Sequence, residues 1–597
     1  MMLRFLLILV CGAWLAVPSP PADVTGRWRV TISTGDDAVI GVASLEQIGD
    51  KVSGWMGPGE TDTIPVSGVL KGDRLTLKTH PKAGFSVPFD ACELTVGDNR
   101  MAGSVESSGA AKRTVEFVRT PQEKRPLRPQ PGRSRCRCII PSMTAPTAKH
   151  RASVLVAVAA AAALLNTSPS NHAGAQGAAT AFIGVNVLPM DQERLLADHT
   201  VIVTDGKIAS IAPAAKAQVP AGAVKVDGKG KYLMPGLGEL HAHIPGGKAP
   251  EGDIERTLFL YVANGVTTIR GMLGDPRHLI YRERVARGEV LGPRIYTSGP
   301  SFNGDRAKTP EAAAAMVVEQ HKAGYDLLKI HPGVPRDAFD AMVAKADELR
   351  IPFAGHVPQA VGLMRALDAK YRSIDHLDGY VEALVPNASV SQTFGVNLAA
   401  QADLSRIPAL VKATRAAGTW QVPTEILLIN WLNDEDPQAM AKWPEMTYVE
   451  PGILAKWIAD KQGFAAKHPR EDRQKLLALR RTLIKALHDG GVPFALGSDA
   501  PQTWNVPGFS AHRELGALVA AGLTPYEALK SGTANLGVYF GTQSTVGTVA
   551  AGKRADLILL DANPLTNIAN SSRIAGVMVH GRWLSKSDID TRLAGGK

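Results

Sequence analysis

Two histidines one residue apart, His241 and His243, end a mostly apolar segment that follows the turn residues Pro235 and Gly236. On a β-strand, residues i and i+2 point to the same side, so the two imidazoles can face one metal ion. Neutral imidazole is the commonest metal ligand in proteins, although this spacing also occurs by chance on protein surfaces. The pair therefore predicts a metal site only if further ligands follow along the chain.

Four more residues that can bind or bridge a metal follow in order, each in or at the end of a short apolar segment: Lys329, His356, His376 and Asp499. Taken singly, each has an ordinary structural explanation. A histidine can be a satisfied core residue, a lysine can snorkel along an apolar surface, and an aspartate can cap the next helix. Because all of them occur on successive apolar segments, we favour the metal site over this set of coincidences.

These polar residues lie within a repeating pattern of apolar segments and segments of helical length, such as 310–323 and 336–349. Alternation of this kind predicts parallel β-strands joined by helices, and hence an α/β fold. Eight strands are predicted, at 237–243, 265–270, 294–298, 325–330, 352–356, 373–376, 419–423 and 493–499. In a (β/α)₈ TIM barrel the catalytic groups come from the carboxyl ends of the strands, where the predicted ligands stand. We therefore predict a catalytic TIM barrel over 235–544.

The ordered set of ligands resembles that of the amidohydrolase superfamily, of the type with a binuclear metal site, over about residues 179–590. Segments 263–270, 292–295 and 521–529 are similar to the imidazolonepropionase-related and Xaa-Pro dipeptidase-like branch. The resemblance implies a small β-sandwich built from both ends of the hydrolase part, at 179–234 and 545–597. Within its first half, Asp205-Gly206 predicts a tight hairpin turn.

The resemblance implies two divalent metal ions, with zinc as the default. His241, His243 and Asp499 would hold one ion, and His356 and His376 the other. Lys329, carboxylated by CO₂, would bridge them, because an ammonium cannot bind a metal whereas a carbamate is an anionic ligand. A metal-bridging hydroxide would attack the substrate, with Asp499 as general base and acid. Histidine and carboxylate ligands also suit manganese, iron or cobalt.

Substrate contacts are predicted for three residues: Tyr380, His331 and Arg270. Tyr380 lies where related enzymes place a tyrosine that binds the substrate carbonyl, but a loop aromatic can equally pack on the barrel rim. His331 follows Lys329 by two positions and so shares its face. Arg270 could hold a substrate carboxylate through two hydrogen bonds, or form a salt bridge at the barrel mouth. Glu239 could orient a ligand histidine or be a buried structural acid, and His512 could line the pocket or pack.

The predicted function is metal-dependent hydrolysis of an amide C–N bond in a small substrate, such as a dipeptide or an N-acyl amino acid. The alternatives are hydrolysis of a cyclic amide or imidazolone-like ring, and a catalytically silent binding protein. Family deaminases generally use one metal and lack the bridging lysine, so Lys329 argues against deamination. No cysteine occurs after Cys138, which excludes a thiolate nucleophile from the catalytic part. We expect a small-molecule or dipeptide substrate and a homo-oligomer.

The basic balance of the chain comes from one segment. Between Lys112 and Arg151 there are eleven Lys or Arg and two Glu, so this segment carries +9 of the net charge of +10. The rest of the chain is nearly neutral, and nucleic acid is not an expected partner. Residues 1–21 contain one early arginine and a short apolar run, as in a secretory signal, which predicts an exported protein, periplasmic or extracellular.

A second signal-like segment occurs within 121–178, after a basic linker. It contains Met143, an apolar run at 153–165 and an Ala-x-Ala sequence at 173–175. Two exported proteins joined in one chain would explain two such signals, whereas a membrane anchor is the alternative. The 13-residue apolar run falls short of the roughly 20 residues that span a bilayer, so no stable membrane span is expected.

The part before the linker, 22–120, predicts a separate small all-β domain. Its short strands recur at the regular spacing of a meander or barrel. They are expected at 26–32, 39–47, 52–55, 64–70, 75–79, 85–89, 101–105 and 114–118. The segment contains no evident catalytic constellation, and both a ligand-holding cup and a structural appendage remain open.

Overall fold

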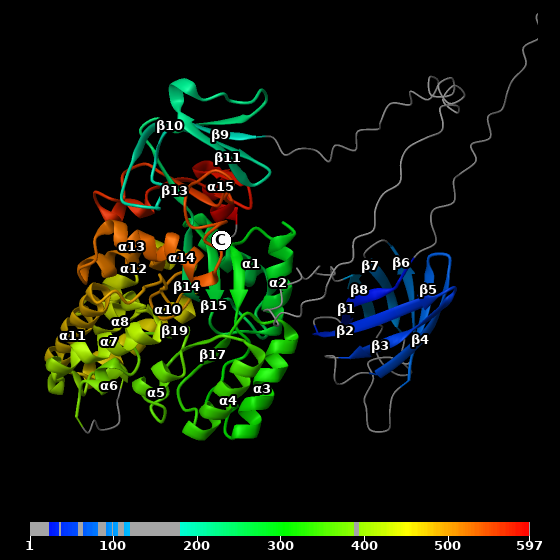
Figure 1. Cartoon of the computed structure of the whole chain (residues 1–597), viewed down its shortest axis with the longest axis horizontal. Helices are drawn as coiled ribbons and strands as arrows, with labels where there is room; N and C mark the ends of the chain where they lie inside the picture. The colour runs from blue at the N-terminus through cyan, green and yellow to red at the C-terminus, as the bar shows by residue number, and fades with distance from the viewer. Residues whose placement is uncertain are drawn as a thin grey trace, which may run out of the picture. The chain divides into compact units, whose positions relative to one another are not determined.

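The computed structural model describes residues 23–34, 37–57, 64–80, 91–97, 100–105, 113–119, 179–386 and 393–595 (Figure 1). The chain divides into two compact units, Met1–Asn171 and His172–Lys597. Both signal-like segments and the basic linker lie outside the described residues. None of the helices within the described ranges is both long enough and apolar enough to cross a membrane.

The N-terminal unit contains a closed antiparallel barrel in which each strand pairs with the next and the first pairs with the last (blue in Figure 1). Burial alternates along its strands, as at 91–96, so one face of each strand points inward. Trp28, Leu75, Met101 and Phe117 are among the apolar side chains that fill the interior. The strands are β1(Gly26–Thr34), β2(Asp37–Ile48), β3(Lys51–Gly57), β4(Ile64–Lys71), β5(Arg74–Thr79), β6(Ala91–Val96), β7(Arg100–Val105) and β8(Arg113–Arg119).

The all-β prediction for this unit is confirmed, with one difference. The predicted strand at 85–89 lies outside the described residues, whereas strand β6 was not predicted. The aromatic residues Phe85 and Phe89 are of a type enriched in strands, whereas Ala91 and Glu93 of β6 are of types that strands contain less often. Pairing of β6 with β5 and β7, rather than local propensity, defines that strand.

The second unit contains the predicted parallel barrel. One sheet joins three of its strands and a second sheet joins four. Parallel bridges Ser298↔Leu327 and Phe302↔Ile330 link the two sheets. The predicted eighth strand makes single bridges, Gln421↔Phe494 on one side and Ala242↔Ala500 on the other, and thereby closes the ring. The strands are β14(Leu237–Ala242), β15(Val266–Gly271), β16(Arg294–Thr297), β17(Leu328–Ile330), β18(Phe353–Gly355), β19(Ser373–Asp375) and β20(Trp420–Val422).

Helices alternate with these strands as predicted. The helix at 310–323 shows why: Thr309 accepts a hydrogen bond from the backbone of Ala312, Pro310 begins the helix, and Gly324 ends it with φ of +83°. The α-helices are α1(Glu251–Ala263), α2(Pro276–Ala286), α3(Pro310–Ala323), α4(Arg336–Leu349), α5(Leu363–Asp368), α6(Tyr380–Ala383), α7(Ile407–Ala417), α8(Glu425–Leu432), α9(Pro437–Met440), α10(Pro451–Lys467), α11(Arg470–Asp489), α12(Phe509–Ala520), α13(Pro525–Gly532), α14(Ala534–Phe540) and α15(Lys586–Gly595). Short 3₁₀ helices are η1(Ala214–Lys216), η2(Thr393–Gly395), η3(Ala399–Gln401), η4(Leu404–Arg406), η5(Pro444–Tyr448) and η6(Ile568–Ser572).

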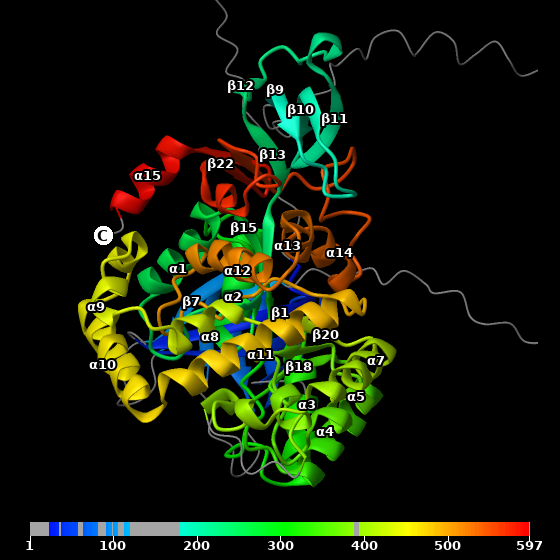
Figure 2. The same cartoon turned by 90° about the vertical axis from the view of Figure 1, so that its left-hand side faces the viewer.

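Strands from both ends of the second unit form a further sheet next to the barrel (teal and red in Figures 1 and 2). β13 pairs with β9 on one side and with β21 on the other, which joins the two ends of the unit. Three strands lie between β11 and β21 in the sheet, yet Ile208 of β11 donates a backbone hydrogen bond to Lys553 just before β21, so the sheet must curl. The strands are β9(Thr180–Val187), β10(Leu196–Thr204), β11(Lys207–Pro213), β12(Val224–Asp227), β13(Tyr232–Pro235), β21(Leu557–Leu560), β22(Ile574–Val579) and β23(Arg582–Ser585).

This arrangement confirms that both ends contribute but corrects the predicted sandwich of two layers. The strands belong to one continuous hydrogen-bonded sheet, and Phe182, Leu233 and Leu557 of its strands belong to one buried apolar cluster. The physical reason is that β13 forms backbone hydrogen bonds with β9 on one edge and with β21 on the other. It thereby joins the strands from the two ends of the unit into one sheet.

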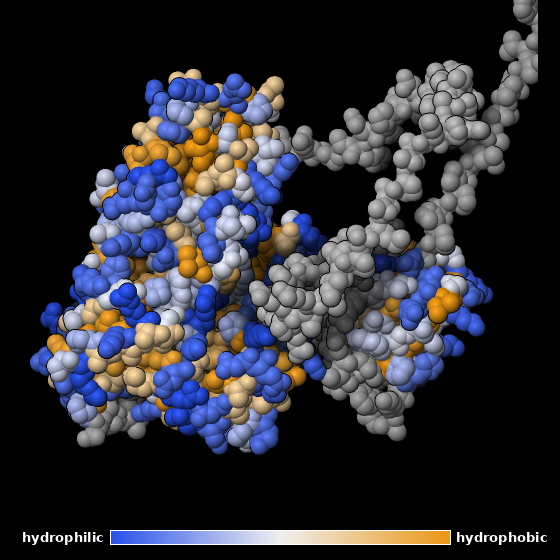
Figure 3. Space-filling view, viewed as in Figure 1, coloured by the Kyte–Doolittle hydropathy of each residue, from blue (hydrophilic) through white to orange (hydrophobic). Residues whose placement is uncertain are grey.

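The surface of the second unit is mixed in character. On the face shown in Figure 3, hydrophilic residues are interspersed with smaller apolar groups. The most exposed large apolar side chains come from separate elements: Met364 of α5, Leu404 of η4 and Val538 of α14. Scattered exposed apolar residues of this kind are normal for a folded domain.

A variant lacking residues 1–175 is expected to fold and to retain the activity of the full chain. Both halves of the curled sheet and all eight barrel strands lie beyond Gln176, and a unit with its own core can fold alone. Thermal unfolding and a metal assay on the shortened protein check this. Insolubility that is cured only by residues 22–120 would show instead that the β-barrel unit is integral.

Candidate metal centre

His241 and His243 lie at the carboxyl end of β14, beside Asp499 on the eighth strand. His243 Nε2 lies 2.6 Å from Asp499 Oδ1, and His241 Nε2 lies 3.4 Å from the same oxygen. One ligand atom from each of the three residues falls within 4.8 Å of the other two. The structure thus brings together the residues predicted to hold the first metal.

The other predicted ligands lie against this group. Lys329 Nζ, from β17, is 3.3 Å from His241 Nε2, and His376 Nε2 is 3.9 Å from Asp499 Oδ2. The ring of His376 lies 4.6 Å from that of His241 and 4.5 Å from that of His356, centroid to centroid. The predicted ligands from five strand ends therefore form one contiguous cluster.

Three polar side chains that were not predicted lie next to Nδ1 of predicted ligand histidines. His241 Nδ1 lies 2.9 Å from Asp375 Oδ2, and His356 Nδ1 lies 2.7 Å from Asp378 Oδ2. His376 Nδ1 lies 2.6 Å from Thr424 Oγ1. Such partners fix ring orientation and leave Nε2 as the metal-binding atom. The two aspartates flank His376 in the sequence, which is a signal that could have found them, whereas Thr424 carries no such signal.

The tautomer of His376 follows from these contacts. The Thr424 hydroxyl donates its proton to the carbonyl of Pro423, so it accepts a hydrogen bond from His376 Nδ1. His376 Nε2 then carries a lone pair and, among the described residues, it is buried without a hydrogen-bond partner. Buried polar atoms are normally satisfied. A cation bound at His376 Nε2 would satisfy this atom, so the residues fit a metal ion.

Burial sets the charge states in the cluster. It lowers the pKa of His241 and of His376 well below the ordinary value, with the nearby Lys329 and other cationic groups adding to the effect. The neutral imidazoles that result are the form that binds metals. Burial also lowers the pKa of Lys329 to about 8, although Asp375 and Asp499 oppose the shift. A neutral amine is the form that reacts with CO₂ to give a carbamate.

Glu239 is hydrogen-bonded to Ser498, the residue before Asp499. Its fully buried carboxylate accepts hydrogen bonds from the backbone and the hydroxyl of Ser498. Burial raises the pKa of this carboxyl to about 8, against the effect of the Ser498 hydrogen bonds. Of the two roles left open for Glu239, the contacts favour the buried structural acid, because they tie the first strand to the eighth.

The substrate-binding prediction for Arg270 needs correction. Its side chain is completely buried, and its guanidinium donates to both oxygens of Asp375 at 3.2 Å and to Ser373 Oγ at 2.9 Å. It also donates to the Leu240 carbonyl and the Tyr539 hydroxyl. All donors of Arg270 are therefore occupied inside the barrel, so the alternative prediction of a salt bridge describes this residue. The salt bridge is made to Asp375, whose carboxylate lies next to His241.

Tyr380 is likewise enclosed. Its hydroxyl lies 2.7 Å from Thr414 Oγ1 and accepts a hydrogen bond of 3.0 Å from Gln421 Nε2. The packing alternative therefore describes Tyr380 better than contact with a substrate carbonyl. His331 is only partly buried and its ring lies 5.0 Å from that of His356, so its predicted place beside the site is retained.

His512 also takes a packing role. Its ring nitrogens lie 3.0 Å from Ser571 Oγ and 2.9 Å from the Asn264 carbonyl. These contacts link α12 to η6 and to the end of α1, and none of them involves a predicted ligand. The pocket role that the sequence left open for this histidine is therefore not supported.

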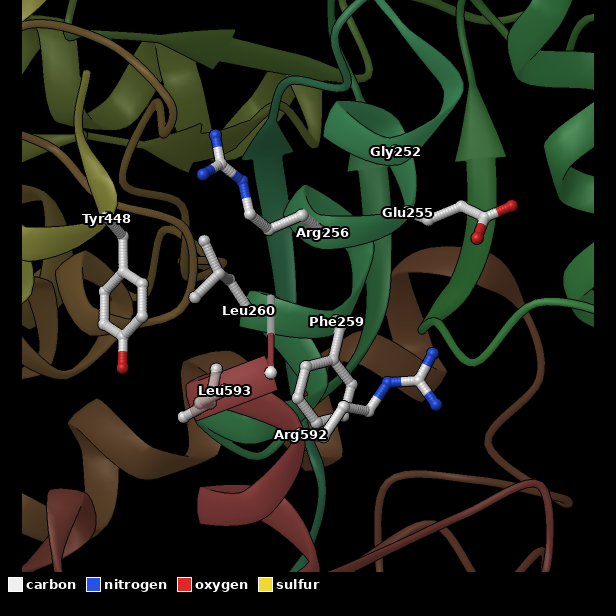
Figure 4. A pocket seen from close by; sticks show the side chains of 9 residues that line it. Gly252, Glu255, Arg256, Phe259, Leu260, Tyr448, Arg592 and Leu593 are labelled. Atoms are coloured by element: carbon white, nitrogen blue, oxygen red, sulfur yellow. The ribbon is translucent and has the colours of Figure 1, made fainter. Parts of the chain in front are cut away.

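A surface pocket of about 390 Å³ lies between α1, η5 and α15 (Figure 4). Phe259 and Leu260 form its apolar side, and the Arg592 guanidinium lies 4.8 Å from the centre of the Phe259 ring. Arg256 and Tyr448 also line it. The pocket contains none of the predicted metal ligands.

The fold and the site define a TIM-barrel protein with a histidine, lysine and aspartate cluster at the carboxyl ends of its strands. The model of the Amidohydrolase family matches residues 232–584, more than half of the chain. The chain belongs to the amidohydrolase family, as the order of its ligands predicted.

Curated relatives include enzymes of several kinds. Ochratoxinase of Aspergillus niger is 26% identical over 382 residues, which cover 56% of this chain and 71% of that protein. Imidazolonepropionase of Micrococcus luteus is 25% identical over 411 residues, covering 65% of this chain and 94% of that protein. A 5-methylthioadenosine/S-adenosylhomocysteine deaminase of Moorella thermoacetica is 31% identical over 182 residues, but the match spans only 29% of this chain and 40% of the deaminase.

Solved structures share the fold. The bottromycin amidohydrolase has a TM-score of 0.53 and 24% identity, and covers 70% of this chain and 90% of its own. A Xaa-Pro dipeptidase with bound methionine has a TM-score of 0.50 and 18% identity, and covers 68% of this chain and 100% of its own. At these identities the similarity shows a common fold.

Proposed function

We propose that the chain is a metal-dependent hydrolase that cleaves the amide C–N bond of a small substrate, a dipeptide or an N-acyl amino acid. The observation that carries the proposal is the single cluster of six predicted ligands, His241, His243, Lys329, His356, His376 and Asp499, in a member of the amidohydrolase family. The ligands come from five different strand ends, as in catalytic sites on TIM barrels.

The cluster provides ligands for two divalent ions, with zinc as the default. His241, His243 and Asp499 would hold one ion, and His356 and His376 the other. Lys329, as a carbamate, would lie between them. When bound, the ions lower the pKa of a water molecule towards neutrality and polarise a substrate carbonyl.

Asp499 is the proposed catalytic residue. Its carboxylate would accept a proton from the attacking water. The protonated carboxyl would then donate this proton to the nitrogen of the departing amine, because a protonated amine is a better leaving group. Glu239, through Ser498, and the backbone hydrogen bond from Asp499 to the His241 carbonyl hold this residue beside the histidines.

The relatives support an acyclic amide substrate most directly, because similar proteins include a Xaa-Pro dipeptidase structure and an ochratoxinase. Hydrolysis of a cyclic amide or an imidazolone-like ring is the second candidate, favoured by the match to nearly all of an imidazolonepropionase. The group that would bind a substrate carboxylate is not Arg270, since that guanidinium is enclosed by Asp375 and Ser373.

A panel of dipeptides, N-acyl amino acids, lactams and imidazolones at matched concentration tests the proposal. We expect turnover of acyclic amides that carry a free carboxylate, loss of this turnover when a chelator removes the metal, and its return when zinc is added. Elemental analysis of the purified protein measures the bound metal. Turnover confined to cyclic substrates would reject the dipeptidase-like assignment. Bound metal without cleavage of any amide would reject the hydrolase itself.

Export remains part of the proposal. It rests on the signal-like sequence at 1–21, which lies outside the described residues. Detection of the protein in the periplasmic or extracellular fraction, with a new N-terminus, would support it, whereas an unprocessed chain confined to the cytoplasm would contradict it.

A further inference from the structure

The strand ends that carry His376 and Thr424 have an unusual backbone. His376, Leu377 and Thr424 have φ values of +63°, +57° and +46°, in the left-handed region that residues other than glycine rarely adopt. Such conformations persist when the surrounding structure holds them. The contacts that hold this backbone therefore decide where the His376 imidazole lies.

One arginine contacts both strand ends. Arg480 of α11 is 2% exposed. Its Nη1 donates to the His376 carbonyl at 2.7 Å, and its Nη2 donates to the Pro423 carbonyl at 3.1 Å. Its Nε donates to Glu425 Oε2 at 2.8 Å. A single rigid guanidinium thus spans the sixth and seventh strand ends.

A second carboxylate completes the arrangement from another helix. Glu514 of α12 accepts backbone hydrogen bonds from Glu425 at 3.0 Å and from Ile426 at 2.7 Å, at the start of α8. Both glutamates are completely buried. Thr424, the partner of His376 Nδ1, lies between Pro423 and Glu425, and both of these neighbours are bound by Arg480.

We propose that Arg480 is a positioning residue of the metal centre: it holds the backbone of His376 against that of Thr424, so that His376 Nε2 faces Asp499 before a metal ion binds. The inference rests on the proposed metal binding but not on the identity of the substrate. Arg480 reaches the cluster through the backbone of His376, and within the described part of the chain its hydrogen bonds go to Glu425 and to backbone carbonyls rather than to the side chain of a predicted ligand.

The test compares Arg480→Gln and Arg480→Lys with Arg473→Gln. Arg473 is a matched control, because it lies on the same helix, is 6% exposed and donates to backbone carbonyls of Leu432 and Asn433, away from the ligands. Cobalt is titrated into the metal-free full chain, with its visible absorption spectrum as a report on ligand geometry. Thermal unfolding of each metal-free variant measures the general loss of stability.

We expect Arg480→Gln to weaken cobalt binding at one site by about 10- to 100-fold, the range typical for residues that support metal ligands, and to change the cobalt spectrum. Arg480→Lys should restore binding only in part, because one ammonium cannot span both carbonyls and Glu425. Arg473→Gln should lower thermal stability while affinity and spectrum stay as in the wild type.

Unchanged cobalt affinity and spectrum in either folded Arg480 variant would overturn the inference. Equal weakening in Arg473→Gln would do so as well, because a general loss of stability would then explain both. Failure of both Arg480 variants to fold would also overturn the inference, because the arginine would then be required for folding in general. If the wild-type chain bound no cobalt, the proposed metal function itself would fail, an outcome distinct from the other three.

Discussion

Replacing Lys329 by alanine is expected to lower kcat/KM by about 1000-fold or more, equivalent to roughly 4 kcal/mol of transition-state stabilisation, and to remove at least one of two bound metal ions. The reason is that the buried Lys329 Nζ lies 3.3 Å from Nε2 of His241, a ligand proposed for one of the two ions. Without the carbamate the ions would lose an anionic ligand shared by both, and their mutual repulsion would be less well compensated.

Elemental analysis and steady-state kinetics on the same preparation measure both effects. Partial recovery with added formate or acetate would show that a carboxylate can occupy the space of the carbamate. Lys322→Ala, on the exposed surface of α3, is the control and should behave as the wild type. Retention of two metals and full turnover in Lys329→Ala would exclude the bridging role.

Replacing Asp499 by asparagine is expected to reduce kcat by about 100- to 10 000-fold, the range that general acid–base groups contribute. The amide has nearly the same shape as the carboxylate but cannot accept a proton from water. It is also a weaker ligand for a cation, so looser metal binding should accompany the loss. His243, at 2.6 Å from Asp499 Oδ1, would lose its anionic partner.

Metal titration separates the two roles of Asp499. At saturating zinc the metal content of Asp499→Asn should return to that of the wild type, while kcat stays low. The control Asp489→Asn changes an exposed carboxylate at the end of α11, where it pairs with Lys485, and should leave kcat unchanged. Recovery of wild-type kcat on saturation would reduce Asp499 to a ligand and remove its role in proton transfer.

The sequence by itself determined the candidate ligands and the order of the strands that carry them. Side-chain periodicity placed His241 and His243 on one side of a strand, and the alternation of apolar and helical segments predicted a parallel barrel. Helix limits at 310–323 were also predictable, because Thr309, Pro310 and Gly324 are local signals that act within a single turn. These features depend on interactions between residues close in the chain.

Only the tertiary structure decided which polar residues are enclosed. Arg270 could have faced the substrate, but its partner Asp375 is 105 residues away, and the ion pair exists only when β15 and β19 enclose the barrel interior together. Tyr380 is satisfied by Thr414 and Gln421 in the same way. No local pattern reports such partners, because a side chain at a strand end has the same sequence context whether it faces the mouth or the core.

The tertiary structure also decided which side chains lie next to the predicted ligand histidines, and that the strands from both ends form a single curled sheet. Thr424 meets His376 across 48 residues, and β13 pairs with β21 across more than 300 residues. Both contacts depend on how strands and helices pack, which fixes distances between segments that are remote in sequence. Local sequence patterns thus indicate which residues can bind a metal. The fold decides how each imidazole ring is oriented and which charged side chains lie beside it.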